Sequence, residues 1–440
     1  MPATTLLGLF EQYGDWTAII SRDRPCSYRE LRQLSLQWIE DLDLPEGSVV
    51  SLYGDYSPQS VALLLALLQR GHVVCPLTSG FDRQKDELYE VAQVSAEIVI
   101  DDDDQVRFVD VGHQVDHPLL LSLRGSCGLV LFSSGATGKS KAVVHDGRRL
   151  LEKFATPRRP KVTIPFMLFD HIGGINTVLH ALCSGGTAVI APDRSPATIC
   201  RLVEAHGVQV LPTSPTFVNL LLLGDHDAHD LSSLEILAYG AERMPEASLA
   251  RLAAAFPDVK LIQNYGLSEV GIMRTKSESN DSLWVKLGGD GFETRVRDGL
   301  LEIKSKTAMV GYLNAESPFT EDGWVKTGDR VETRGEYFRI LGRQSDIIII
   351  GGEKVYPAEV EDLISTMPDV LDVVVSKEAN AITGNIVKAQ VQLATDEKRS
   401  AFRKRMAAFL KDRLAPFKIP QKVQVTQSAL HNARFKKERK

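Results

Sequence analysis

A strand–helix–strand alternation near the start of the chain is the feature that most limits its fold. Residues 48–53 form a short apolar run, and a second apolar run begins at Val73. Between them, Ser57 and Pro58 open an apolar helix that ends near Gly71. Two buried strands joined by a helix are typical of a parallel sheet with helices on its faces. The sequence therefore predicts an α/β fold.

The composition indicates a globular protein and disfavours some classes of function. Apolar residues make up 43% and charged residues 25% of the 440 residues, and the net charge is −6. This length predicts two or three domains. The acidic net charge disfavours a general nucleic-acid binder, because such proteins carry basic surfaces. The longest apolar run, residues 61–68, is too short to span a bilayer.

Neither the cysteines nor the acidic residues form a metal motif. The cysteines have no paired spacing, so reduced core thiols are expected; they are Cys26, Cys75, Cys127, Cys183 and Cys200. The run of acids at residues 101–104 is predicted to be a solvated turn rather than a metal site. The N-terminus lacks the basic and apolar segments of a signal peptide, and we expect a cytoplasmic protein.

Residues 131–145 form a segment suited to holding phosphate. Glycines let the backbone approach an anion, hydroxyl groups donate hydrogen bonds, and lysines supply positive charge. Gly138-Lys139-Ser140 fits the end of a Walker A loop, but Ser133 stands where the first glycine of that motif belongs. An ordinary turn after a strand is the alternative interpretation.

The segment resembles the phosphate loop of the adenylate-forming enzymes, which include acyl-CoA synthetases, aryl-acid ligases, peptide-synthetase adenylation domains and luciferases. Ser140 replaces the proline of the family motif. Three more segments follow in the family's order: residues 263–269 resemble the Tyr-Gly-x-Thr-Glu motif, residues 324–329 resemble the Thr-Gly-Asp motif, and residues 337–343 end in the Gly-Arg pair.

The resemblance implies a site for ATP and Mg²⁺. Glu269 would bind Mg²⁺, Asp329 would accept from the ribose hydroxyls, and Arg343 would contact the ribose or the phosphate. A helix-capping serine with an acidic first turn is the bland alternative for Ser268 and Glu269. The implied nucleotide-binding residues are Ser133, Ser134, Gly135, Thr137, Gly138, Lys141, Tyr239, Gly240, Ala241, Asn264, Tyr265, Gly266, Ser268, Asp329 and Arg343. Tyr239 stands where the family has glycine.

The resemblance also implies a pocket for a carboxylic acid. His171 would line this pocket and the channel of the incoming thiol, with Asp170, Gly173 and Gly174 beside it. An aspartate at this place holds the substrate amine in amino-acid-activating relatives, so an amino-bearing acid stays open. His171 could instead be a structural residue at a strand-to-helix corner.

The end of the chain resembles the family's C-terminal lysine motif. Lys436 would bridge the carboxylate and the α-phosphate, with Lys437 and Arg434 as alternatives if the register differs. Phe435 stands where the family has glycine. The implied architecture is a large N-terminal α/β adenylation domain (residues 1–341), a hinge (342–346) and a small, mobile α+β C-terminal domain (347–440).

The predicted function is that of an ATP-dependent acid–thiol ligase acting through an acyl-adenylate, in secondary metabolism. Lys436, Glu269, His171 and Arg343 would be catalytic. The partners would be a small carboxylic acid and either coenzyme A or the phosphopantetheine of a carrier protein, with no nucleic acid and no membrane span. The alternative is a non-catalytic scaffold for another pathway protein. The departures that motivate it are Ala136, Ser140, Tyr239, Ser345 and Phe435.

Overall fold

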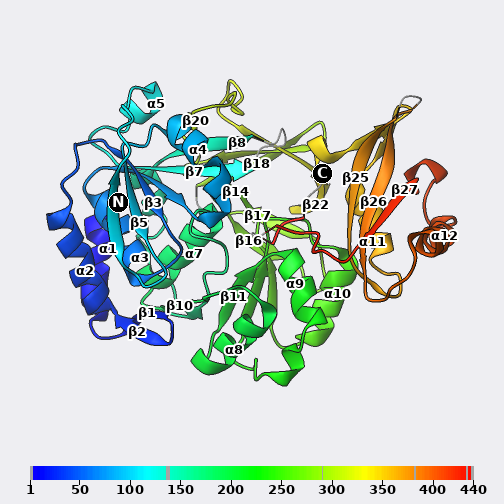
Figure 1. Cartoon of the computed structure of the whole chain (residues 1–440), viewed down its shortest axis with the longest axis horizontal. Helices are drawn as coiled ribbons and strands as arrows, with labels where there is room; N and C mark the ends of the chain where they lie inside the picture. Colours follow the sequence, from blue (N-terminus) through cyan, green and yellow to red (C-terminus); the bar gives the residue numbers. More distant parts are fainter. Residues whose placement is uncertain (1–2, 135–138, 290, 381–382, 433–434, 438–440) are drawn as a thin grey trace.

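The computed structural model describes residues 3–134, 139–289, 291–380, 383–432 and 435–437 (Figure 1). The first sheet contains the strands predicted near residues 48 and 73. In spatial order its strands are β20 (Gly311–Tyr312), β8 (Ser140–Asp146), β7 (Gly128–Ser134), β4 (Val73–Leu77), β3 (Val49–Tyr53), β5 (Ala96–Ile100) and β6 (Val106–Asp110). β3 pairs in parallel with β4 and β5, and β4 with β7, which confirms the predicted parallel sheet.

Side-chain caps define where the helices beside this sheet begin. The predicted helix opening at Ser57 is α3 (Pro58–Gln69), and the Ser57 side chain accepts from the Ser60 N–H. Ser27 and Glu30 form a reciprocal capping box at the start of α2 (Tyr28–Asp41). Each cap satisfies N–H groups that the first helical turn leaves unpaired.

A second sheet places the carboxyl ends of several parallel strands at one edge. Its strands in spatial order are β13 (Lys260–Gln263), β12 (Ile236–Tyr239), β11 (Val210–Thr213), β9 (Val162–Thr163), β10 (Thr187–Ile190), β1 (Thr17–Ser21) and β2 (Arg24–Ser27). The pairs from β13 to β1 are parallel, and β2 is antiparallel to β1. α8 (Pro196–His206), α9 (Pro215–Leu223) and α10 (Glu246–Ala255) contribute apolar residues to the core beside it.

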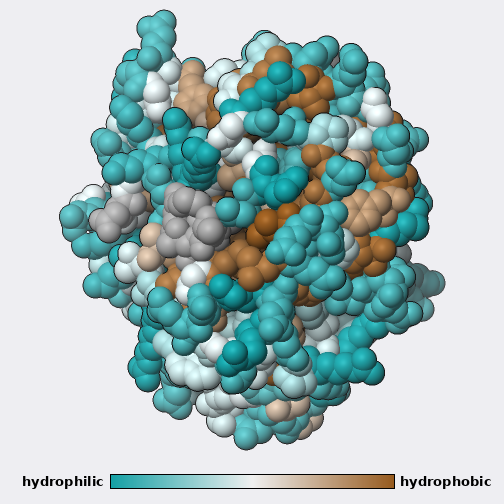
Figure 2. Space-filling view, turned by 90° about the vertical axis from the view of Figure 1, so that its left-hand side faces the viewer, coloured by the Kyte–Doolittle hydropathy of each residue, from teal (hydrophilic) through white to brown (hydrophobic). Residues whose placement is uncertain are grey.

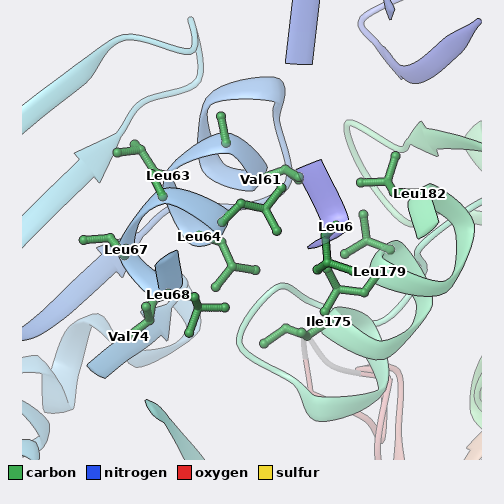
Figure 3. Packing of buried hydrophobic residues seen from close by; sticks show 14 of the residues in the cluster. Leu6, Val61, Leu63, Leu64, Leu67, Leu68, Val74, Ile175, Leu179 and Leu182 are labelled. Atoms are coloured by element: carbon green, nitrogen blue, oxygen red, sulfur yellow. The ribbon is translucent and has the colours of Figure 1, made fainter. Parts of the chain in front are cut away.

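The largest apolar cluster joins the helices that lie between these two sheets. Leu6 of α1 (Ala3–Tyr13), Val61 and Leu64 of α3, and Leu179 of α7 (Ile172–Cys183) are all buried in it (Figure 3). Each fully buried leucine of this kind contributes about 1.5–3 kcal/mol to stability. The cluster therefore fixes the position of the two sheets relative to each other. It also fixes the loops at the edges of these sheets.

The later part of the chain adds an antiparallel sheet and a small C-terminal unit (Figure 1). The antiparallel sheet contains β16 (Arg274–Ser277), β17 (Val285–Gly288), β22 (Tyr337–Arg343), β21 (Val325–Arg334), β19 (Leu300–Ser305) and β18 (Phe292–Arg297). The C-terminal unit contains β23 (Ile348–Ile350), β24 (Glu353–Val355), α11 (Pro357–Ile364), β25 (Val370–Asn380), β26 (Gly384–Leu393), α12 (Arg399–Leu410) and β27 (Lys422–Thr426). After β27 the chain returns toward α9 (Figure 1).

The remaining elements are short or lie at the surface. They are α4 (Lys85–Ala92), α5 (Pro118–Leu121), α6 (Gly147–Glu152), β14 (Gly266–Leu267) and β15 (Gly271–Ile272), with short 3₁₀ turns between elements. Hydrophilic residues cover most of the face on the side of α1 and α2, with apolar residues gathered near its middle (Figure 2). No helix in the described part of the chain has the length and apolar character needed to cross a bilayer. Residues 101–104 form the predicted turn, in which the Asp101 carboxylate accepts from two backbone N–H groups.

Candidate active site

A large cleft of about 2540 Å³ opens at the carboxyl ends of the second sheet's strands. It is also lined by the antiparallel sheet, the C-terminal unit and the C-terminal tail. Ligand sites of open parallel sheets lie at this edge, where strands end and loops begin. Predicted site residues that line the cleft are Ser133, Lys141, Asp170, His171, Ala241, Asn264, Tyr265, Gly266, Ser268, Glu269, Asp329, Arg343 and Lys436.

The phosphate-loop segment joins two antiparallel strands, β7 and β8, with Ser133 opposite Lys141 and Ser134 opposite Ser140. Asn314 holds the start of β8, because its side chain accepts from the Ala142 N–H (2.9 Å) and donates to the Ser140 carbonyl (2.8 Å). The predicted contacts of Gly135, Thr137 and Gly138, and the departure at Ala136, lie outside the described residues.

Glu269 and Lys141 meet at Tyr312, which the sequence analysis did not identify. The Tyr312 hydroxyl donates to Glu269 Oε1 (2.5 Å), and Lys141 Nζ lies 5.1 Å from the centre of the Tyr312 ring. This contact engages one oxygen of the carboxylate in a cleft that also contains a lysine. One carboxylate beside the predicted phosphate loop suits Mg²⁺, which binds one or two carboxylates together with phosphate oxygens and water.

Tyr265, Asp329 and Arg343 form a second polar group in the cleft. The Tyr265 hydroxyl donates to Asp329 Oδ2 (2.5 Å), and Arg343 Nε lies 3.5 Å from Asp329 Oδ1. β21 and β22 create this pair because Asp329 and Arg343 face each other in their register. Burial raises the pKa of Asp329, and the charge of Arg343 partly offsets this. The group can accept hydroxyl hydrogen bonds and neutralise a phosphate.

His145 ties β8 to the segment that carries Ser268 and Glu269. Its Nε2 lies 2.7 Å from the Ser268 carbonyl oxygen, and the imidazole is buried. Burial lowers the pKa of His145 to about 4, and the Ser268 carbonyl offsets only part of this effect. The ring is therefore neutral at pH 7, and its N–H can donate to that carbonyl.

Replacing His145 with asparagine should reduce the loss of stability on acidification. The unfolded chain protonates this histidine near its ordinary pKa of about 6.5, whereas the folded chain does so only near 4. The stability due to neutral His145 is thus complete above pH 6.5 and is lost as the pH falls toward 4. Urea unfolding measures the free energy of unfolding at pH 7 and at pH 5. Between these pH values the variant should lose about 2 kcal/mol less of this free energy than the native protein. Equal losses in both proteins would contradict the assignment.

His171 and Lys436 face each other in the cleft. His171 caps α7, with Nδ1 accepting from the Gly173 N–H (3.0 Å). Its Nε2 lies 3.4 Å from Lys436 Nζ. The predicted residue Asp170 is buried beside it and accepts from the Thr78 hydroxyl (2.6 Å). Two site residues that are 265 positions apart in the sequence are therefore neighbours.

The C-terminal tail reaches the cleft even though Phe435 replaces the family's glycine. Phe435 has a φ of +51°, in the left-handed region that favours glycine. Its ring packs against the rings of Phe166 (5.3 Å between centroids), Phe217 (5.7 Å) and His431 (5.2 Å). Its carbonyl accepts from the Ser214 hydroxyl (2.9 Å). Aromatic packing thus holds a backbone conformation that is unfavourable for phenylalanine.

Lys436 and Lys437 both line the cleft, but the register of the tail gives their side chains different partners. Lys437 Nζ donates to the Val373 carbonyl (2.8 Å) and lies 3.2 Å from Asp372 Oδ1. Its backbone N–H donates to Glu242 (2.6 Å). The other alternative, Arg434, lies outside the described residues. Of the two described lysines, Lys436 is the one beside His171.

Some predicted residues are not part of the cleft wall. Tyr239 is 1% exposed and packs in the apolar core of the second sheet, because strand alternation turns its side chain away from the cleft. Gly240 sits where an added Cβ would lie 2.8 Å from the Asn264 carbonyl, which explains the glycine by close backbone approach. Gly173 and Gly174 lie in the first turn of α7, behind His171. Tyr239 is therefore a core residue, and the prediction that it floors the nucleotide pocket was wrong.

Arg194 is a lining residue that the sequence analysis missed. It borders the small pocket that contains His171 and Lys436. Its Nε donates to the Phe166 carbonyl (2.7 Å), and its Nη1 lies 2.8 Å from Asp55 Oδ2. The sequence carried a signal for it, because Arg194 lies in the loop four residues after the carboxyl end of β10, where such sites form.

The fold and this arrangement define an α/β protein with a polar cleft between a large region and a small C-terminal unit. Comparison with known proteins gives the family. The sequence model of the AMP-binding enzymes matches residues 9–294, and that of the AMP-binding enzyme C-terminal domain matches residues 359–437. The chain belongs to the AMP-binding enzyme family.

Among curated relatives, a 3-[(3aS,4S,7aS)-7a-methyl-1,5-dioxo-octahydro-1H-inden-4-yl]propanoyl:CoA ligase of Mycobacterium tuberculosis is 31% identical over 332 residues. An indoleacetate–CoA ligase of Aromatoleum aromaticum is 27% identical over 326 residues. The matches cover 69% and 67% of this chain, but only 63% and 62% of the relatives.

Solved structures share the fold over nearly the whole chain. ATP-bound MatB from Rhodopseudomonas palustris has a TM-score of 0.81 at 22% identity, covering 98% of this chain and 96% of that one. The anthranilate CoA ligase AuaEII, in complex with anthranoyl-AMP, has a TM-score of 0.81 at 18% identity, covering 99% and 97%. The predicted fold class, α/β with a smaller C-terminal part, is confirmed.

Proposed function

We propose that this protein is an ATP-dependent carboxylic acid–thiol ligase that acts through an acyl-adenylate. The observation that carries the proposal is the pairing of His171 Nε2 with Lys436 Nζ, 3.4 Å apart in the cleft. The relatives named as CoA ligases support it, although the chain spans less than two thirds of their length.

The hydrogen bonds of His171 make this pairing suited to a carboxylate. Because Nδ1 accepts from the Gly173 N–H, a neutral ring carries its proton on Nε2. That N–H then faces the ammonium group of Lys436, so both groups are donors. A carboxylate at this point would accept from both groups and gain charge-assisted hydrogen bonds. Leu168 and Phe435 also border the large cleft and would supply apolar walls for the rest of an acid.

The proposed reaction has two steps. In the first, a carboxylate oxygen attacks the α-phosphorus of ATP, the bond to the β-phosphate bridging oxygen breaks, and pyrophosphate leaves. In the second, a thiol sulfur attacks the acyl carbon, the thiol proton is lost, and AMP leaves. Lys436 would hold the carboxylate and neutralise charge on the α-phosphate. Positioning and charge neutralisation lower such barriers without a protein nucleophile.

The nucleotide would lie along the other side of the cleft. Asp329 would accept from the ribose hydroxyls, Tyr265 would offer its ring to the adenine, and Lys141 would contact the phosphates. Glu269 would hold Mg²⁺, which when bound neutralises charge on the pyrophosphate leaving group. Arg343, whose guanidinium group lies beside Asp329, would contact the ribose or the phosphate.

The proposal includes a boundary between two domains at residues 342–346. The match of a separate C-terminal family model to residues 359–437 supports a division in this region. We propose that residues 347–440 move relative to residues 1–341 between the two steps, with Ser345 and Asp346 at the hinge. The thiol would be that of coenzyme A, as in the named relatives, or of a carrier protein. The free cysteines support a cytoplasmic setting, where thiols stay reduced.

A screen for acid-dependent pyrophosphate release tests the proposal. Purified protein with ATP and Mg²⁺ should release pyrophosphate with at least one member of an aryl, fatty and β-keto acid panel, and added coenzyme A should yield its thioester. Titration calorimetry with ATP·Mg²⁺ accompanies the screen. An absence of both binding heat and pyrophosphate release would overturn the proposal and favour the scaffold alternative.

A further inference from the structure

Basic side chains gather on the large region at a place outside the cleft. Lys153 follows α6, Arg158 lies in the loop after it, His180 is in the last turn of α7, and Arg274 begins β16. None of the four lines the cleft. We call these four residues the basic cluster.

Backbone and ring contacts bring the four elements together. Lys153 Nζ donates to the Ile272 carbonyl (3.4 Å), two residues before Arg274. The Arg158 N–H donates to the hydroxyl of Ser184, the C-cap of α7 (3.0 Å). Phe154 packs edge-on against His180 with 4.7 Å between ring centroids, and Lys153 Nζ lies 5.3 Å from the centre of the Phe154 ring.

The charges of Lys153, Arg158 and Arg274 oppose one another and keep His180 neutral. Burial, and then Arg158, lower the pKa of Lys153 to about 8. Partial desolvation lowers the pKa of the exposed Arg158, burial lowers that of His180, and the neighbouring cations add to both effects. Within the described ranges, no carboxylate forms an ion pair with any member of the cluster. Like charges held together in this way cost stability unless an anion joins them.

We propose that the basic cluster is a binding site for a phosphate-type dianion. Arg158 and Arg274 are exposed, so their guanidinium groups are open to a ligand from solvent. Two guanidinium forks and an ammonium group can together surround a tetrahedral oxyanion with charge-assisted hydrogen bonds. The half-buried Lys153 would form the inner wall of the site, where water screens the attraction least. The site requires neither ATP nor acid turnover, so it stands apart from the proposed ligase activity.

Calorimetric titration of the full chain with inorganic phosphate tests the site. The double variant Arg158→Gln/Arg274→Gln should bind phosphate about tenfold more weakly than the native protein, or worse. The control is Arg107→Gln/Arg297→Gln, which removes the same two charges from exposed positions on β6 and β18. It should bind like the native protein. Sodium chloride at matched ionic strength corrects for general screening.

Thermal unfolding gives a second readout that a purely structural role would not produce. Phosphate should raise the melting temperature of the native protein and of the control, but not that of the cluster variant. The variant without phosphate should be no less stable, because it loses like-charge repulsion. Unchanged phosphate affinity in the cluster variant, or no phosphate binding by the native protein, would overturn the proposal.

Two further experiments determine where phosphate binds and which kind of phosphate compound the site prefers. Lys141→Met removes a cation from the cleft, so phosphate binding that is lost with this change belongs to the cleft and would refute the cluster site. Glycerol 2-phosphate in place of phosphate distinguishes the two sources of the dianion. If glycerol 2-phosphate binds as tightly as phosphate, the ligand is a phosphomonoester on a larger molecule. If it binds much more weakly, the ligand is free phosphate. Either result supports the site, provided that the cluster variant binds the compound more weakly than the native protein does.

Discussion

Replacing Lys436 with alanine should reduce acid-dependent pyrophosphate release by about 10²–10³-fold, because the charge that meets the attacking carboxylate is lost. Lys436 Nζ lies 3.4 Å from His171 Nε2 in the cleft. ATP affinity should change by less than about threefold, because the proposed nucleotide contacts of Asp329, Tyr265 and Lys141 would remain. Pyrophosphate release at saturating acid and a separate ATP titration measure the two quantities.

Lys437 provides the matched control for Lys436. It is adjacent in the sequence and carries the same charge, but its Nζ binds Asp372 and the Val373 carbonyl. Lys437→Ala should slow the reaction by less than about tenfold, through looser docking of the tail. If Lys437→Ala lost as much activity as Lys436→Ala, or if Lys436→Ala kept its rate, the assignment of the catalytic lysine would be wrong.

Asp329→Asn should weaken ATP binding by about 10–100-fold, because the amide has only one acceptor oxygen and no charge. The carboxylate is buried between Tyr265 and Arg343. ATP and 2′,3′-dideoxyadenosine triphosphate should differ in affinity for the native protein and much less for the variant, since the dideoxy compound lacks the proposed partners of Asp329. Calorimetric titration of both proteins with both nucleotides gives the four affinities from which the coupling between Asp329 and the ribose hydroxyls is calculated.

Tyr265→Phe separates ribose binding from local structure. This change removes the hydroxyl that donates to Asp329 and keeps both the ring and the carboxylate. ATP affinity should fall by less than about threefold, and discrimination against the dideoxy nucleotide should persist. Equal discrimination by native protein and Asp329→Asn would show that Asp329 does not bind the ribose.

Local sequence signals were sufficient for much of the fold. The cap at Ser57, the apolar helix after it and the strands on either side depend on neighbours within a few residues, and the structure has them where they were predicted. The facing of Asp329 and Arg343 also follows from one hairpin. Such features were predictable because hydrogen bonding and side-chain period act over short stretches of chain.

Strand alternation limited the motif-based prediction at Tyr239. The resemblance placed this residue in the nucleotide pocket, but its side chain points into the core of the second sheet. Arg194 and Tyr312 show the opposite error, because neither belongs to a motif and both lie at the site. A motif identifies residues near a site, whereas the pleat and the neighbouring segments decide which side chains enter it.

The sequence by itself determined the α/β fold, the family resemblance and the order of the nucleotide-site motifs. Only the tertiary structure decided that Lys436 rather than Lys437 meets His171, a partner 265 positions away in the chain. Contacts of that range depend on how whole sheets and the C-terminal tail pack together. The ring of Phe435, held between Phe166 and Phe217, sets this register in place of the family's glycine.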